Sequence, residues 1–383
     1  MRTSGRTRTV TSERRALPRA LDAAAEEPAQ RTVSRLRARR RTAIRVVSAG
    51  GGLFFFIFAL QIIKSGARAV IPVLDNLDIA GPVNSLGFGW LAAYLALSGS
   101  PVAAIGTTLL AGGVFNEREA FAVIGGSRLG ASFIVLAVGY VLYMGGRRSS
   151  DGLSIGVVSL LTTFTTQGPA VLLGLVSLHY GWLDGVQFTP PKGMLDWIDT
   201  VYGRPVDFLN DVLPSALVFA AGVLVLLGSF ALFDRALPQL EAGSPGFERT
   251  LRRLDSKWLM FAMGCAVTSL TLSVSISLTL LVPLSLKGYL RREQVIPYVM
   301  GANITTFIDT LAGALVLGGA SAFTVVLTEM VAVGFVSGLV LWFAYGAYSR
   351  AILAVASTVT HSQRNLGLFL AVIVAVPLLL LLL

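Results

Sequence analysis

The sequence predicts an all-α polytopic membrane protein, and three features of the chain support this fold class. Of its 383 residues, 54% are hydrophobic and only 14% are charged, whereas charged residues make up about 25% of an average soluble domain. The apolar residues come in uninterrupted runs of about 20, the length that crosses roughly 30 Å of hydrocarbon as a helix. These runs lack the two-residue alternation of barrel strands, which excludes a transmembrane β-barrel.

The residue types needed for most enzymes and metal sites are scarce. The chain has one cysteine, Cys265, and two histidines, His179 and His361, too few for a disulfide framework or for a site built from cysteine or histidine. It has no phosphate-binding P-loop, and no paired carboxylates or nucleophile with a base at a usable spacing. We therefore expect no enzyme, with no catalytic residue, no bound metal and no cofactor.

The positive charge is concentrated at the N-terminus. Residues 1–45 hold thirteen arginines against four acidic residues, although the whole chain carries a net charge of only +10. This segment is polar and contains two prolines, so we expect a disordered, arginine-rich cytoplasmic tail that lies near anionic headgroups. Nucleic acid is not an expected partner, because juxtamembrane arginines already follow from the positive-inside rule.

Nine apolar segments follow the tail, and two of them differ from the rest. The segments at 84–112 and 257–286 are rich in glycine, serine and threonine, which favours re-entrant helical hairpins over straight spans. If both hairpins return to their own side, the basic loops lie in the cytoplasm and the acidic loop at 181–208 lies outside. We therefore expect a multi-pass protein of the bacterial inner (plasma) membrane with a cytoplasmic N-terminus. The nine segments are 48–72, 84–112, 121–144, 152–180, 209–234, 257–286, 295–317, 321–347 and 365–383.

Two pairs of short motifs recur at one spacing. Leu97-Ser98-Gly99-Ser100 precedes Leu272-Ser273-Val274-Ser275 by 175 residues, and Gly126-Ser127-Arg128-Leu129 precedes Gly301-Ala302-Asn303-Ile304 by the same number. The first half enters the membrane from inside and the second from outside, so the sequence predicts inverted-topology repeats, each with a re-entrant hairpin. The expected domains are the tail at 1–45, a first transmembrane repeat at 46–180, an extracellular loop at 181–208, a second repeat at 209–347 and a C-terminal segment at 348–383 with an additional hydrophobic helix.

The same motifs resemble those of a known family. The glycine- and phenylalanine-rich stretch at 51–60 is similar to the opening span of the bacterial sodium-phosphate cotransporters, which are related to the animal type II sodium-phosphate cotransporters. The serine-containing motifs at 97–100 and 272–275 resemble the Gln-Ser-Ser-Ser motif in each hairpin of that family. The family's Gly-Ala-Asn-Ile-Gly-Thr-Thr motif resembles Gly301-Ala302-Asn303-Ile304-Thr305-Thr306. The resemblance covers about residues 48–320. It implies sodium-dependent phosphate symport, with the motif serines and glutamines binding phosphate and sodium.

The chain departs from the family pattern at five positions. Leu97 and Leu272 stand where the family has glutamine, Gly99 and Val274 each replace a serine, and Arg128 replaces the first motif asparagine. The chain therefore resembles a divergent member of the family. The resemblance supports the family's fold for this chain more firmly than it supports the family's substrate or coupling ion.

The hairpin tips and the spans after them supply the candidate substrate site. Unwound tips expose helix N-termini that suit an anion, and small residues allow its close approach. The alternative is ordinary helix packing, because serine, threonine and glycine are common between membrane helices. The candidate substrate-binding residues are Ser98, Gly99, Ser100, Arg128, Ser273, Ser275, Asn303, Thr305 and Thr306.

Three charged residues stand clear of the span ends: Arg128, Asp309 and Glu329. Each is unfavourable in a membrane by about 3 kcal/mol unless it is paired. Arg128 is a candidate forked ligand for an oxyanion, and Asp309 and Glu329 are candidate ion-coupling residues for a sodium ion or a proton. Two alternatives stay open: an Arg128–Asp309 ion pair that only holds the halves together, and a Glu329 that faces water in a vestibule.

These observations predict an ion-coupled secondary transporter that moves phosphate or a similar small oxyanion by alternating access. The alternatives are an exporter or carrier of a different anion, and a non-transporting membrane scaffold with the same fold. The expected partners are inorganic phosphate or a similar small anion and the lipid bilayer, and a homodimer is left open.

Overall fold

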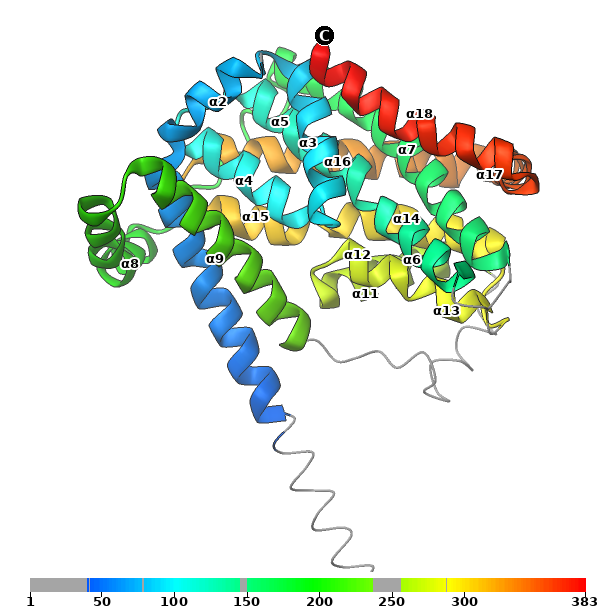
Figure 1. Ribbon diagram of the computed structural model, residues 1–383, viewed down its shortest axis with the longest axis horizontal. Helices are drawn as coiled ribbons and strands as arrows, with labels where there is room; N and C mark the ends of the chain where they lie inside the picture. The colour runs from blue at the N-terminus through cyan, green and yellow to red at the C-terminus, as the bar shows by residue number, and fades with distance from the viewer. Residues whose placement is uncertain (1–39, 41, 78, 145–149, 237–255, 287) are drawn as a thin grey trace, which may run out of the picture.

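The computed structural model describes residues 40, 42–77, 79–144, 150–236, 256–286 and 288–383. Within these ranges the chain is helical and contains no strand (Figure 1), which confirms the all-α class. Of the predicted tail, residue 40 and residues 42–45 belong to a helix, and 1–39 lie outside the described residues. The basic loop residues 147, 148, 249, 252 and 253 lie outside them as well.

Seven helices of the described chain are long and apolar enough to cross a membrane, so the protein is a helical membrane protein. Each overlaps one of the seven apolar segments that the sequence predicts to cross, and the sixth extends well beyond its predicted end at 347. The spans are Thr42–Asn76, Glu117–Val141, Gly152–Tyr180, Ser215–Ala236, Arg292–Val316, Ala320–His361 and Gln363–Leu382.

The two remaining apolar segments are each interrupted by a leucine. In the first, α3 (Pro82–Ala96) ends at Leu97 and α4 (Ser100–Ala111) follows. In the second, α11 (Lys257–Thr271) ends at Leu272, and the short helices α12 (Val274–Thr279) and α13 (Leu281–Leu286) follow. Each first helix has 15 residues, about 22 Å of helix, which is shorter than the roughly 30 Å hydrocarbon core.

Both interruptions have the same backbone conformation. Leu97 has φ 50° and Leu272 has φ 48°, and they are the only non-glycine residues with positive φ in the described chain. A side chain in the left-handed region crowds the backbone and costs about 1–2 kcal/mol. In both segments the first helix therefore ends at a leucine with a strained, left-handed backbone conformation.

The helices that follow cross these segments in the same way. A Cβ on Gly126 of α5 (Glu117–Ala131) would lie 2.2 Å from the carbonyl oxygen of Leu86, and a Cβ on Gly301 of α14 (Arg292–Thr305) would lie 2.2 Å from that of Phe261. Glycine is thus required at both crossings. The same correspondence of 175 residues holds for a second set of contacts, Gly89 with Val123 and Gly264 with Tyr298.

The N-terminal span runs beside α9 (Ser215–Ala236) in the opposite direction (Figure 1). Gly66 lies against the backbone of Phe219, and Gly222 lies against Ile63. Small residues let two membrane helices approach closely. The span ends in the short helices η1 (Ala67–Val70) and α2 (Ile71–Asn76).

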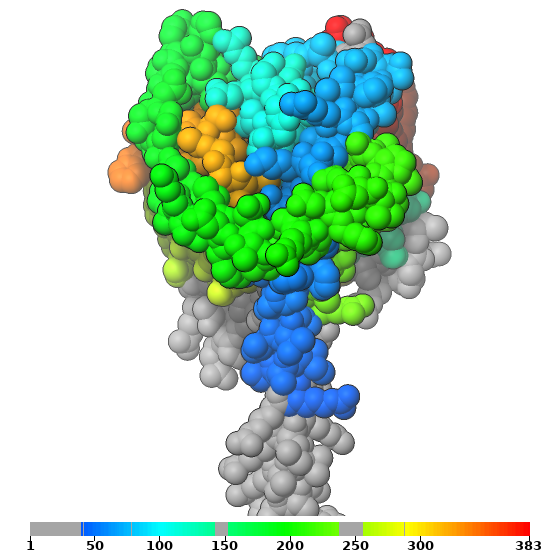
Figure 2. Space-filling model, turned by 90° about the vertical axis from the view of Figure 1, so that its left-hand side faces the viewer, coloured from blue at the N-terminus to red at the C-terminus, as the bar shows by residue number. Residues whose placement is uncertain are grey.

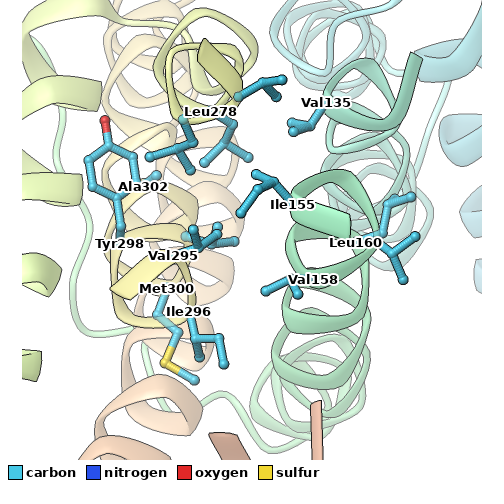
Figure 3. Close-up of a cluster of buried hydrophobic side chains, with 14 of the residues drawn as sticks. Val135, Ile155, Val158, Leu160, Leu278, Val295, Ile296, Tyr298, Met300 and Ala302 are labelled. Atoms are coloured by element: carbon cyan, nitrogen blue, oxygen red, sulfur yellow. The ribbon is translucent and has the colours of Figure 1, made fainter. Parts of the chain in front are cut away.

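The largest apolar core joins helices from the two halves of the chain. Val135 of α6 (Phe133–Met144) and Ile155 of α7 (Ser150–Tyr180) face Leu278 of α12 and Val295 of α14 (Figure 3). The second buried cluster joins α5, α7, α15 (Phe307–Val316) and α16 (Ala320–Leu339), and it surrounds the charged residues described below.

The C-terminal helices differ in part from the expected segments. The chain continues from α16 through a π-helical turn, η2 (Val340–Ala344), into α17 (Tyr345–His361), so the boundary expected at residue 347 falls inside a helix. The additional hydrophobic helix is α18 (Gln363–Leu382). It packs on α3, where the Tyr94 hydroxyl donates to the carbonyl of Ile373 at 3.0 Å.

Much of the predicted loop at 181–208 is a long helix, α8 (Lys192–Val212), which continues past the expected boundary at 208, so that the next span begins at Ser215 rather than at 209. Ile198 and Tyr202 on this helix are buried and pack against Ile57 and Phe58 of the N-terminal span. Figure 2 shows α8 lying across that span below a hollowed face. A cavity of about 640 Å³ opens there between the two helices, and Lys64 and Asp199 are among its lining residues.

Candidate functional site

Three charged side chains are buried in the described part of the protein, and they come from three helices. Arg128 on α5 is 2% exposed, Asp309 on α15 is 8% exposed and Glu329 on α16 is fully buried. Charged groups in such positions are unfavourable unless they are paired and hydrogen-bonded. Their surroundings therefore define the candidate site.

The helices place Arg128 opposite the first interruption. Helix α5 begins with a capping box at Asn116 and Glu119 and ends with Arg128 in its last turn, where a positive charge interacts favourably with the helix dipole. Helix α4 begins at Ser100, next to Gly99, and a Cβ on Gly99 would lie 2.7 Å from the Ser127 carbonyl oxygen. The first residues of α4 are thereby held against α5.

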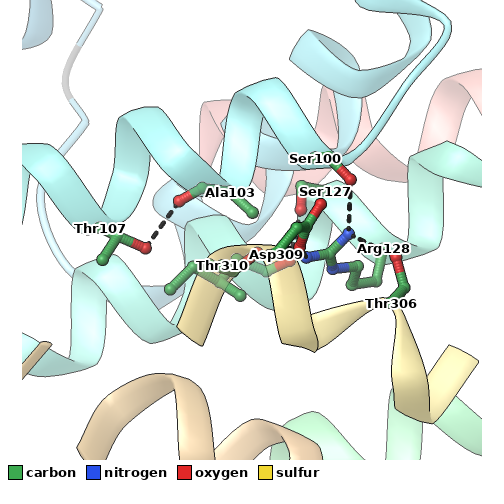
Figure 4. A network of polar contacts seen from close by, with 9 residues as sticks. Ser100, Ala103, Thr107, Ser127, Arg128, Thr306, Asp309 and Thr310 are labelled. Carbon is green, nitrogen blue, oxygen red and sulfur yellow. Dashed lines mark hydrogen bonds and ion pairs between the residues drawn. The ribbon is translucent and has the colours of Figure 1, made fainter. Parts of the chain in front are cut away.

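The Arg128 guanidinium lies within a set of hydroxyl groups (Figure 4). Nη1 donates to Thr306 Oγ1 at 3.1 Å and to Ser100 Oγ at 3.5 Å, and Nη2 donates to Thr310 Oγ1 at 2.7 Å. The Cζ atom lies 4.6 Å from the centre of the Phe307 ring. The hydroxyls come from α4 and from the start of α15, so both halves of the chain contribute to the site.

The ion pair between Arg128 and Asp309 is loose. Arg128 Nη2 lies 3.6 Å from Asp309 Oδ1, and Thr310 links them, since its hydroxyl accepts from Nη2 and donates to Oδ1 at 2.8 Å. Among the described residues, Arg128 Nε and Asp309 Oδ2 have no hydrogen-bond partner. Each group therefore keeps unused hydrogen-bonding capacity.

Glu329 occupies an adjoining position. Its Oε1 accepts from Nε2 of Gln167 on α7, and a Cβ on Gly125 would lie 3.0 Å from the same oxygen. Gly125 is three residues before Arg128 on α5, and the charges of Arg128 and Glu329 interact. The vestibule alternative for Glu329 is not supported, because its side chain is fully buried.

Four predicted site residues meet in one place: Ser100, Arg128, Thr306 and Asp309. Ser98 is half-buried at the interruption. The second interruption lies next to the first, because Ser275 Oγ donates to the Leu97 carbonyl at 3.4 Å.

The remaining predicted residues have local or separate contacts. Ser273 caps α12 by accepting from the Ile276 amide. Thr305 donates to the Cys265 carbonyl, away from Arg128. Asn303 donates to Thr163 Oγ1 at 3.1 Å, and Ser132 forms a hydrogen bond with the same hydroxyl at 2.7 Å.

Sequence reasoning did not identify Thr310, Gln167 or Thr163. A glutamine within an apolar span was an available signal for Gln167, since a buried amide needs partners. Thr163 and Thr310 carry no such signal, because threonine is common between membrane helices.

Hydroxyl donors and a partly used guanidinium suit an oxyanion, and a buried carboxylate suits a proton or a cation. Among the described residues, no group of three histidine, cysteine, aspartate or glutamate side chains is placed to hold a metal ion. Comparisons of the chain with known protein families, with curated proteins and with solved structures give no match. The resemblance to sodium-phosphate cotransporters therefore stays a prediction.

Proposed function

We propose that this protein is an ion-coupled secondary transporter that moves phosphate or a similar small oxyanion across the plasma membrane by alternating access. The observation that carries the proposal is the buried Arg128, whose guanidinium is surrounded by hydroxyls from both halves of the chain. A residue that is so unfavourable in a membrane marks a functional site by default.

The contacts of Arg128 favour anion binding over a purely structural role. A structural ion pair gains most from short, bidentate contacts, whereas Arg128 contacts Asp309 only at 3.6 Å and leaves its Nε without a partner in the described chain. The fork of a guanidinium matches the oxygens of phosphate. Serine and threonine hydroxyls can rotate to donate to the same anion.

The proposed architecture is a pair of inverted repeats, at 46–180 and 209–347, each with a re-entrant hairpin. Three observations support it: the left-handed leucines at 97 and 272, the glycine crossings that recur after 175 residues, and the antiparallel packing of the N-terminal span on α9. In transporters of this kind, the substrate binds near the midplane where the repeats meet. Arg128 lies between elements of the two repeats.

Asp309 and Glu329 are the proposed ion-coupling residues. In the family that the sequence resembles, glutamines of the hairpins help to bind sodium, and here both positions hold leucine, which has no oxygen ligand. Sodium needs several oxygen ligands, so the loss of two weakens that site. The buried carboxylates are the groups left to bind a coupling cation or a proton.

The proposal is tested with purified protein and labelled phosphate. We expect saturable phosphate binding that is at least tenfold weaker in Arg128→Lys, a change of about 1.4 kcal/mol, because lysine keeps the charge and loses the fork. Proteoliposomes should also take up phosphate when an ion gradient is imposed. Equal binding by both proteins, or no uptake under sodium and proton gradients alike, would overturn the proposal and favour a scaffold.

A further inference from the structure

Two buried oxygen atoms beside the Arg128 site lack hydrogen-bond partners in the described chain: Glu329 Oε2 and Gln167 Oε1. They belong to side chains that already contact each other, since Gln167 Nε2 donates to Glu329 Oε1. Buried polar atoms without partners are rare. Two such oxygen atoms on one pair of interacting side chains, Glu329 and Gln167, therefore need an explanation.

The chemistry of the two groups suggests what completes the contact. An ionised carboxylate and an amide oxygen can only accept, whereas a protonated carboxyl has one O–H donor. A proton on Glu329 Oε2 can be donated to Gln167 Oε1 while the existing bond from Nε2 is kept. One proton would then provide partners for both oxygens in a two-bond pairing of acid and amide.

We propose that Glu329 and Gln167 form the proton site that couples oxyanion transport to the proton gradient. This inference rests on the transport function proposed above. A proton from water on one side of the membrane forms the O–H bond at Glu329 Oε2, and the same bond breaks to release a proton to water on the other side. No electron is transferred and no other bond changes.

The surrounding charges explain why proton and anion binding are linked. With Glu329 ionised, the buried region carries two negative charges and one positive charge, which opposes the entry of an anion at Arg128. With Glu329 protonated, Arg128 and Asp309 balance, so an oxyanion meets less repulsion. Protonation should therefore favour anion binding, and anion binding should favour protonation to the same extent.

The elements packed against α16 define the charges that act on Glu329. Helix α5 contributes Arg128, whose ion-pair partner is Asp309 of α15, while α7 faces Glu329 with the neutral Gln167. Helix α4 has no titratable residue, and Tyr298 of α14 is turned toward Ser277. A metal cation fits the pair poorly, because Gln167 presents an N–H donor to the carboxylate.

Infrared spectroscopy of the purified protein tests the proton site without any transport. Lowering the pH should produce the C=O band of one buried protonated carboxyl, which should be missing in Glu329→Gln and retained in Asp309→Asn. In Gln167→Met the band should shift, because the carboxyl loses its amide partner. A wild-type protein without a titrating buried carboxyl, or a band that survives in Glu329→Gln, would overturn the inference.

Proteoliposome flux then tests the coupling. If one proton accompanies one monovalent anion, a gradient of one pH unit should accumulate the monovalent form of phosphate about tenfold. Glu329→Gln, which resembles the neutral acid, should keep phosphate exchange and lose accumulation driven by the pH gradient. Ser337→Ala, at another buried position of α16, is the matched control and should behave like the wild type.

The two failures are distinguishable. Phosphate accumulation driven by sodium alone, with no titrating carboxyl band, would overturn the proton inference and leave the transport function intact. A titrating band at Glu329 without any anion flux would overturn the transport function, and with it the coupling role of this pair.

Discussion

The pairing of Arg128 with Asp309 gives a prediction that separates a structural role from a ligand role. We compare Arg128→Leu, Asp309→Leu and the double variant. Removing one partner of a buried ion pair typically costs about 3–5 kcal/mol, because a charge is left buried and unpaired. If the two losses were independent, the double variant would lose about 6–10 kcal/mol, as the sum of these values.

The geometry of the site predicts unequal single losses. Asp309→Leu leaves Arg128 with Glu329 as a nearby charge of opposite sign, so its cost should lie near the lower end of that range. Arg128→Leu leaves two carboxylates without a positive charge and removes three hydrogen bonds, so it should be the more destabilising change. The double variant should lose less than the sum, because Asp309 is no longer left unpaired.

The assay is reversible unfolding in mixed detergent, followed by tryptophan fluorescence, with phosphate binding measured on the same samples. We expect coupling of at least about 1 kcal/mol between the sites, and loss of binding in both the Arg128→Leu and the double variant. Additive losses would refute the proposed interaction of the two charges. Recovery of both stability and binding in the double variant would refute the ligand role of Arg128.

Three further predictions concern the fold. Gly126→Ala and Gly301→Ala should each destabilise the protein by about 1–3 kcal/mol or more, since a Cβ would lie 2.2 Å from a backbone oxygen. The control Gly334→Ala, with no atom near its Cβ, should be neutral or stabilising in the same thermal unfolding experiments. Equal effects of the three substitutions on stability would contradict the close helix crossings at Gly126 and Gly301. Leu97→Gly should stabilise the protein by about 1 kcal/mol and Leu97→Val should destabilise it, because only glycine is free of strain at φ 50°. A valine variant more stable than the glycine variant would contradict this account of the strain. A cysteine at Asp196 should be labelled from outside the cell, and labelling only from the cytoplasm would contradict the inverted topology.

The sequence alone was enough to predict the helical membrane class and the seven spans. Once a β-barrel is excluded, apolar runs of this length can cross a membrane only as helices. The predicted spans therefore overlap the long apolar helices of the structure. The two interrupted segments were also located correctly, because glycine, serine and threonine gather there. That leucine would adopt the left-handed conformation at 97 and 272 was not predictable, since this position usually takes glycine.

The candidate site was predicted in part. Arg128, Asp309 and Glu329 were identified because a charge in an apolar run is conspicuous, and Ser100 and Thr306 followed from the motifs. Gln167 was missed because a single sequence does not reveal which helices pack together, and its importance depends on contact with Glu329. The long helix α8 and the packing of α18 on α3 likewise depend on tertiary contacts.

Exchange of phosphate across proteoliposome membranes tests the central claim most directly, because it requires substrate binding and alternating access without any net ion gradient. Vesicles loaded with unlabelled phosphate should transiently accumulate labelled phosphate when they contain the wild-type protein or Ser337→Ala. Vesicles that contain Arg128→Lys should accumulate at most about a tenth as much at low phosphate, in line with the expected loss of affinity. Exchange by Arg128→Lys at the wild-type rate, or no exchange by the wild type, would contradict the account.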